Sequence, residues 1–158
     1  MRRRDKELSD PGEIKNILAS SLFCHVGLSD GDFPYCVPMC FAYHKEKVYL
    51  HGAGQGKKIE ILNNNPRVCI IVEQECSLIK SSTSCEYGMA YESVMIQGTA
   101  RFLSGAEKSR GLEIISTKYV GAPGGPYPDN QISGIAVIEV TVESCSGRRS
   151  GMAASGLR

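Results

Sequence analysis

The chain has 158 residues, of which 42% are hydrophobic and 22% charged, and its formal net charge is +1. This length is typical of one domain with its own core, and the composition is that of a soluble globular protein. A nucleic-acid-binding protein usually carries a basic stripe. Here the basic residues gather only at 2–4 and at 148–149, which we expect to be solvated tails.

Seven cysteines occur in the chain, an odd number that does not suggest a disulfide framework in a protein of this length. Cys69 stands between Val68 and Ile70, in an apolar run where cysteine acts as a small hydrophobic residue. No apolar stretch follows the basic N-terminus, so no signal peptide is predicted. No run has the length of a membrane span. We therefore expect a reduced, cytoplasmic protein that does not bind membranes or nucleic acids.

The first predicted element is a helix that follows Asp10. Asp10 is a suitable N-cap, Pro11 fits the first helical position, and Glu13 gives the spacing of a capping box. Apolar residues then recur at helical spacing. Strands are predicted over 22–28, 34–43 and 48–51, polar turns over 29–32 and 44–47, and a second helix over 57–63.

In the second half of the chain, strands are predicted over 67–73, 91–102 and 135–142, and a helix over 106–119. Residues 74–90 are less regular, and 121–130 are rich in proline and glycine, which predicts a loop. Gly98 is expected to mark a bulge or a close approach of two backbones. The tail from Gly147 is expected to be disordered.

Six strands with few helices and short connections favour antiparallel hairpins over an alternating β-α pattern. The predicted fold is mainly β, a six-stranded antiparallel barrel with flanking helices. It forms a single domain over residues 1–146, and 147–158 are its tail.

The segment VYLHGAGQGKKIEIL, residues 48–62, places three glycines, His51 and two lysines between a strand and a helix. It is not a Walker loop, because three residues rather than four separate Gly52 from Gly56, and Lys58 stands where a hydroxyl is needed. It also lacks the final spacing of the dinucleotide fingerprint. Glycines, helical N–H groups and lysines could hold one terminal phosphate of a mononucleotide. A strand-to-helix turn with two solvated lysines explains the same residues equally well.

The ordered stretches MRRRDKELSDPGEIKNIL, PYCVPMCFAY, VYLHGAGQGKKIEILNNNPRV, YESVMIQGTARFL and IAVIEVTVESCSGRR resemble the pyridoxamine 5′-phosphate oxidase-like family, the FMN-binding split-barrel proteins. Within it, the chain is most similar to the branch of the nitroimidazole-resistance (Nim) proteins. The resemblance implies FMN as cofactor and a homodimer with flavin sites at the subunit interface. It also implies an oxidoreductase that reduces a small oxidised compound, with nitroimidazoles and other nitroaromatics as candidates.

The resemblance also implies roles for particular residues. Those expected near the cofactor are Lys57 and Lys58 at the phosphate, Leu50, His51 and Gly52 near the ribityl chain and phosphate, Val37, Pro38 and Met39 at the flavin ring, and Ser93, Val94 and Cys85. His51 is the expected active-site histidine, which could give a proton to a reduced substrate. One departure is Glu92, where the family often has arginine, and it puts an anion contact at that position in doubt.

Pro38 supports part of this assignment from the sequence alone. Proline cannot donate to a strand ladder, so its strand should be an edge, and a flavin could use the free backbone groups of Val37 and Met39. A protective proline on an edge strand is the alternative. Cys36 and Cys40 share a strand face and could be redox-active or bind a metal. No second pair at zinc spacing accompanies them, so we expect small barrel-wall residues and no metal.

Two other functions stay open. The same fold could hold flavin or haem without a dedicated substrate, because a fold does not fix a function. A deazaflavin-dependent reductase is a third possibility. Pyridoxamine 5′-phosphate oxidation itself is disfavoured, because the tail offers only Arg148, Arg149 and Arg158 and no substrate-phosphate cluster of arginine and histidine.

Overall fold

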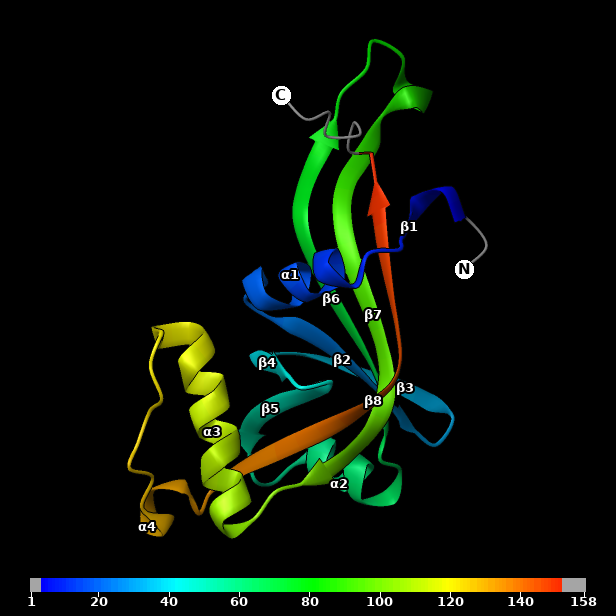
Figure 1. Cartoon of the computed structure of the whole chain (residues 1–158). Helices are drawn as coiled ribbons and strands as arrows, with labels where there is room; N and C mark the ends of the chain where they lie inside the picture. Colours follow the sequence, from blue (N-terminus) through cyan, green and yellow to red (C-terminus); the bar gives the residue numbers. More distant parts are fainter. Residues whose placement is uncertain (1–3, 152–158) are drawn as a thin grey trace.

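The computed structural model describes residues 4–151. Its main feature is one antiparallel sheet of eight strands in the order β3-β2-β6-β7-β8-β5-β4, with β1 paired to β8. The edges of this order are β3 (Phe33–Met39) and β4 (Phe41–His44), although Cys40 alone separates them in the chain. The sheet must therefore curl around its core (Figure 1). The expected antiparallel split barrel is confirmed, as an open sheet and not a closed barrel.

The predicted number of strands, six, was too low. The remaining strands are β1 (Glu7–Leu8), β2 (Cys24–Asp30), β5 (Lys47–Ala53), β6 (Arg67–Ile79), β7 (Gly88–Phe102) and β8 (Ile135–Ser150). β1 has only two residues and so carries no recognisable pattern. The single predicted strand over 34–43 is two strands, because the chain leaves β2 after Met39 and joins β5 from Phe41 onward.

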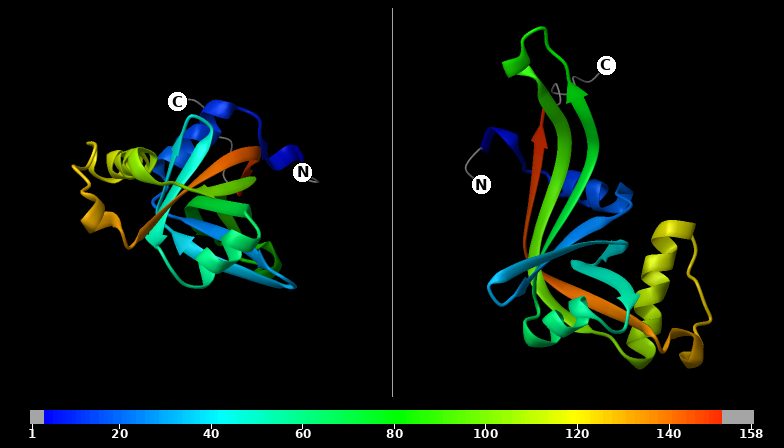
Figure 2. Two further views of the ribbon diagram at one scale, coloured as in Figure 1. Left: turned by 90° about the horizontal axis from the view of Figure 1, so that it is seen from below. Right: turned by 180° about the vertical axis from the view of Figure 1, so that it is seen from behind.

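Strands β6, β7 and β8 are longer than predicted and form an arm that projects from the barrel (Figure 1, Figure 2). The parts of the arm that were not predicted, 74–79, 88–90 and 143–150, are mostly exposed or half-buried. Their residues need no apolar alternation and gave no strand signal. The predicted disordered tail is wrong for 147–150, because Gly147 pairs with both Val94 and Leu8 inside the sheet. Residues 152–158 lie outside the described part of the chain.

The helices and short helical turns are η1 (Arg4–Lys6), α1 (Pro11–Ser20), α2 (Lys57–Asn64), η2 (Ser84–Glu86), α3 (Gly105–Val120) and α4 (Asp129–Ile132). The predicted N-cap of α1 is confirmed, since Asp10 Oδ1 accepts a hydrogen bond from the Gly12 N–H at 2.8 Å. α4 lies at the end of the segment that was predicted to be loop. No helix within residues 4–151 is both long and apolar enough to cross a membrane.

Gly98 is a close-approach point, as predicted. The register between β7 and β8 shifts at Gln97/Gly98, and a Cβ at Gly98 would stand 2.2 Å from the Thr141 carbonyl oxygen. Only glycine lets the two backbones come this close.

Two apolar clusters hold the fold together. The larger one fills the inside of the curled sheet and includes Phe41, Leu50 and Ile70. The smaller one lies between the sheet and α3 and includes Tyr49 and Leu112. Because Leu50 and Tyr49 are neighbours on β5, this strand has one face in each cluster. The end of β5 is therefore fixed from both sides, and the candidate site is built on it.

Glu92 is part of a buried polar network and does not face an open site. Its carboxylate accepts hydrogen bonds from Gln74 Nε2 at 2.8 Å and from Arg149 Nε at 2.6 Å. Arg149 also pairs with Glu13 of α1 at 2.9 Å. A buried carboxylate is stable only when it is partnered in this way. The residue that departs from the family pattern thus ties α1 to the arm.

Candidate functional site

The end of β5, the end of β3 and the start of α2 meet around Gly52. A Cβ at Gly52 would lie 2.6 Å from Lys58 Nζ and 3.7 Å from Met39 Cε, so the lysine amine occupies the space that a side chain would fill. Gly56, at φ 99°, turns the chain into α2, and no side chain caps the first N–H groups of this helix. Free helical N–H groups beside a lysine form an arrangement that suits an anion.

The two adjacent lysines have different environments. Lys57 is exposed and forms an ion pair with Asp30, which raises the pKa of its amine. Lys58 is half-buried, and no carboxylate among the described side chains pairs with it. Burial lowers the pKa of Lys58, because charge is costly away from water. An anion bound beside Lys58 would relieve this cost, whereas Lys57 already has its counter-charge.

His51 points to the opposite face of β5 from Gly52, since neighbouring residues of a strand alternate. Its Nδ1 is buried and has no hydrogen-bond partner among the described residues. Burial lowers the pKa of His51, and the positive charge of Lys58 lowers it further. A buried polar nitrogen without a partner is uncommon in a folded protein. It therefore marks a place where a ligand could supply the missing hydrogen bond.

A cavity of about 320 Å³ lies next to His51, between β5, α3 and the loop after α3. Its other polar lining includes Cys40, Ser116, Tyr119 and Tyr127. The Tyr119 hydroxyl is held in place, because it donates to the Leu22 carbonyl at 2.5 Å and accepts from the Phe41 N–H at 3.0 Å. Aromatic walls with a few polar groups are typical of sites for planar ligands.

The sequence did not reveal these cavity residues. Tyr119 contributed only to helical spacing, Cys40 was interpreted as a wall residue, and Tyr127 stood in a proline-rich loop. Nothing local to them indicated a site, because they are brought to His51 by the packing of α3 on the sheet.

The three residues predicted at the flavin ring lie on an edge strand, as the proline suggested. Pro38 is exposed, Val37 is half-buried, and Met39 is buried with its Cε close to Gly52. Leu50 is different. Its side chain is only 1% exposed and belongs to the core, and its strand pairs on both sides. Leu50 therefore supports the site from within the barrel, and its side chain cannot touch a bound ligand.

Ser93, Val94 and Cys85 are not brought to His51 within one chain. His51 pairs with Val137 of β8, whereas Ser93 pairs with Arg148 of the same strand. These two β8 positions are eleven residues apart, which is about 35 Å along a strand. Cys85 lies in η2 at the tip of the arm, at the opposite end of the molecule from α2 (Figure 1).

The buried side chain of Val94 also fills the core, so it cannot touch a ligand. Within the described residues, no group of three histidine, cysteine or acidic side chains could hold a metal ion. All seven cysteines are free thiols.

The lowered pKa of His51 predicts a fold that loses stability in acid. The unfolded chain takes up the proton near pH 6.5, whereas folded His51 takes it up only at lower pH. Protonation therefore favours the unfolded state as the pH falls below about 6.5. The urea midpoint should drop between about pH 7.5 and about pH 5.5, and it should drop less in the His51→Gln variant. Equal drops in both proteins would contradict this role of His51.

Comparison with known proteins identifies one family and several similar structures. The family described as pyridoxamine 5′-phosphate oxidase matches residues 10–149. A candidate 5-nitroimidazole antibiotic resistance protein of Bacteroides thetaiotaomicron is 32% identical, with a TM-score of 0.79 over 90% of this chain and 86% of that one. No curated protein matches.

Two more distant structures share the fold. The flavocytochrome Anf3 of Azotobacter vinelandii is 23% identical, with a TM-score of 0.83 over 96% of this chain and 72% of that one. An FAD- and haem-binding protein of Mycobacterium smegmatis is 15% identical, with a TM-score of 0.83 over 92% of this chain and 74% of that one.

Proposed function

Because the chain belongs to the pyridoxamine 5′-phosphate oxidase family, we propose that it binds FMN and is an oxidoreductase that reduces a small oxidised compound. The observation that carries this proposal is that two polar groups at the end of β5 lack partners: the amine of Lys58 and the Nδ1 nitrogen of His51. Lys58 lacks a carboxylate among the described residues, and His51 Nδ1 lacks a hydrogen bond. The phosphate of a cofactor would give Lys58 its counter-charge, and a ligand in the cavity on the other face of β5 would give His51 its hydrogen bond.

The residues present fit FMN in type and in place. Lys58 and the first N–H groups of α2 would hold the phosphate. The exposed edge at Pro38, with Val37 beside it, would lie along the flavin ring. The cofactor, when bound, would supply the electron transfer, and the protein groups would tune and orient it.

His51 has a separate task in this proposal. Burial keeps its imidazole neutral at neutral pH, so it can offer an N–H to a substrate oxygen or accept a proton at its free nitrogen. The cavity beside it is lined by Tyr119 and Tyr127, which suit a flat aromatic compound. Nitroaromatic compounds, including nitroimidazoles, are the first substrate class to test, and the name of the Bacteroides relative supports this choice.

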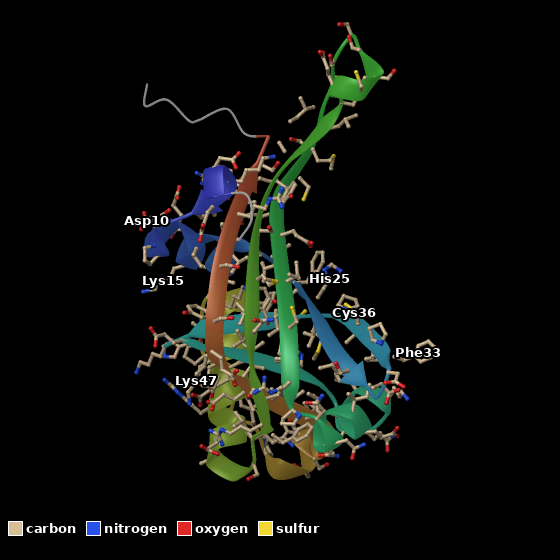
Figure 3. All side chains as sticks on the ribbon, turned by 90° about the vertical axis from the view of Figure 1, so that its right-hand side faces the viewer. Asp10, Lys15, His25, Phe33, Cys36 and Lys47 are labelled. Carbon is tan, nitrogen blue, oxygen red and sulfur yellow. The ribbon has the colours of Figure 1, made fainter. Side chains whose placement is uncertain are left out.

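A homodimer is the second part of the proposal. Ser93 and Cys85 are expected near the cofactor, and only another copy of the chain could bring them to Lys58. The exposed side of the β2–β3 hairpin is available for such a contact. Figure 3 shows His25, Phe33 and Cys36 on the same side of the molecule, away from Asp10 and Lys15. Phe33 is 79% exposed there, and a contact with a second copy of the chain would cover this apolar surface.

Absorption spectroscopy of the purified protein, with mass spectrometry of the ligand released on denaturation, tests the cofactor. We expect a flavin spectrum and FMN. The holoprotein is then reduced without oxygen and mixed with metronidazole, with free reduced FMN as the control. Faster reoxidation in the protein supports a reductase, and equal rates indicate a flavin-binding protein without this activity. A colourless protein that does not take up added FMN would refute the cofactor assignment.

A further inference from the structure

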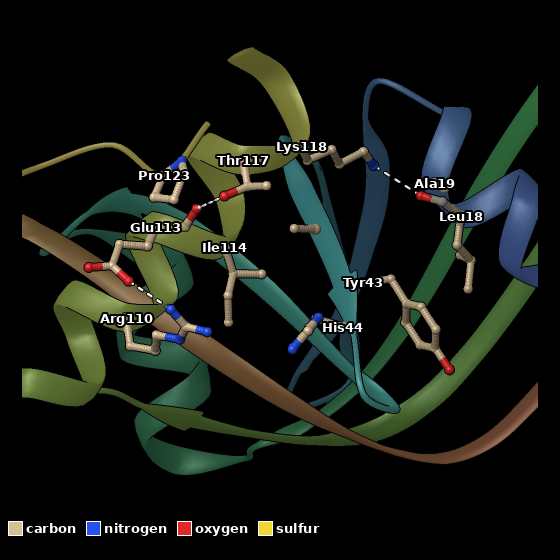
Figure 4. Close-up of a pocket in the computed structure, with 11 residues that line it drawn as sticks. Leu18, Ala19, Tyr43, His44, Arg110, Glu113, Ile114, Thr117, Lys118 and Pro123 are labelled. Carbon is tan, nitrogen blue, oxygen red and sulfur yellow. Dashed lines mark hydrogen bonds and ion pairs between the residues drawn. The ribbon is translucent and has the colours of Figure 1, made fainter. Parts of the chain in front are cut away.

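A second cavity lies between α1, β4 and α3, and it shares no lining residue with the cavity beside His51 (Figure 4). Its volume is about 400 Å³, which is within the range of pockets that hold small molecules. Nothing in the proposed flavin function uses it.

Lys118 of α3 is the main charged group in this cavity. Its amine donates a hydrogen bond to the Leu18 carbonyl at 3.0 Å and lies 3.4 Å from the centroid of the Phe41 ring. The carbonyl belongs to the last turn of α1, where a cation is favourable. Among the side chains that the structure describes, no carboxylate pairs with Lys118, and burial lowers the pKa of its amine to about 8. An ammonium group has three donors, and the carbonyl takes only one.

Three of the other polar residues of the cavity bond to one another. Arg110 pairs with Glu113 at 2.9 Å, and the Thr117 hydroxyl donates to the Glu113 carbonyl at 2.8 Å. The remaining wall is largely apolar and includes Leu18, Ala42, Ile114 and Pro123. Figure 4 shows Ile114 and His44 on opposite sides of the space, with Lys118 at one end. The cavity therefore combines an apolar body with one cation that has no carboxylate partner among the described side chains.

We propose that this cavity binds a small amphipathic carboxylate, with the carboxylate beside Lys118 and the apolar part against Ala42 and Ile114. A carboxylate suits the position because it would give a half-buried ammonium its missing counter-charge in a charge-assisted hydrogen bond. The apolar wall would favour a ring or a short hydrocarbon over a fully polar anion. A role for Lys118 only as a cap of α1 would explain its bond to Leu18 but would give no preference for carboxylates.

The test compares two probes on the full-length protein saturated with FMN. Calorimetry measures the binding of 2-naphthoate and of its neutral analogue 2-naphthalenemethanol. We expect the carboxylate to bind at least about 10-fold more tightly. Lys118→Met should remove this preference, while Lys15→Met, an exposed lysine on α1, should leave it intact. Ile114→Trp, which fills the cavity, should weaken both probes.

Three results would overturn the proposal. One is equal affinity of the wild-type protein for both probes. Another is an unchanged preference for the carboxylate in Lys118→Met or, if that variant does not fold, full binding of both probes by Ile114→Trp. The third is release of FMN by 2-naphthoate, which would place the probe in the flavin site instead.

Discussion

Lys58→Met should lower the affinity for FMN by about 10- to 100-fold, whereas Lys57→Met should change it by less than about 3-fold. The two lysines are neighbours in the chain, but only Lys58 is half-buried beside Gly52 without a counter-charge among the described residues. Lys57 is exposed and paired with Asp30, and exposed ion pairs and charges contribute little. Titration of the apoprotein with FMN, followed by flavin fluorescence, measures the difference.

Riboflavin is the matched ligand control, because it has no phosphate. Its affinity should be the same in the wild-type protein and in Lys58→Met. Gly52→Ala is the matched structural control: its Cβ would lie 2.6 Å from Lys58 Nζ and push the flexible amine aside. This variant should also lose FMN affinity.

Asp30→Asn tests the other lysine. It releases Lys57 from its ion pair and should change FMN affinity little. If Lys57→Met lost as much affinity as Lys58→Met, Lys57 would have to leave Asp30 to bind the phosphate, and the present assignment would be wrong.

The two lysines also show how far the sequence could predict this site. The strand, the glycine loop and the start of α2 were predictable, because Gly56 and the residues after it carry local signals of a turn and a helix. The difference between Lys57 and Lys58 was not, because it depends on Asp30, which lies 27 positions earlier in the chain. Long-range pairing of this kind leaves no mark on the spacing of nearby residues.

The fold shows the same difference between features that local sequence signals predict and features that long-range pairing sets. The helix after Asp10 and the close approach at Gly98 follow from local chemistry, and both were predicted. The break at Cys40 and the extension of β8 to Ser150 were missed. Cys40 stands in an apolar run whose pattern predicts a single strand. The end of β8 is polar because it lies in the arm, where few of its side chains contact the core. Family resemblance placed Ser93 near the cofactor, but the register of β8 places it far from His51 in the same chain.

His51→Ala should slow the reduction of a nitroaromatic substrate by about 100- to 10,000-fold, the usual range for the loss of a group that transfers a proton. FMN affinity should fall much less, because the phosphate is assigned to Lys58 and α2. The rate of flavin reoxidation by metronidazole under anaerobic conditions measures the first effect, and FMN titration the second. Cys40→Ser is the control, since Cys40 lines the same cavity and the change is nearly isosteric.

The His51→Ala variant also distinguishes a flavin enzyme from a haem-binding protein of this fold. A histidine with a free, buried nitrogen beside aromatic side chains could also be an axial ligand. If the purified protein contains haem, His51→Ala should abolish its Soret band and leave flavin binding mostly intact. If it contains only flavin and His51→Ala reduces metronidazole as fast as the wild type, His51 has no part in the chemistry. The unpartnered nitrogen would then be explained by binding of the cofactor alone, and FMN affinity rather than turnover would respond to the substitution.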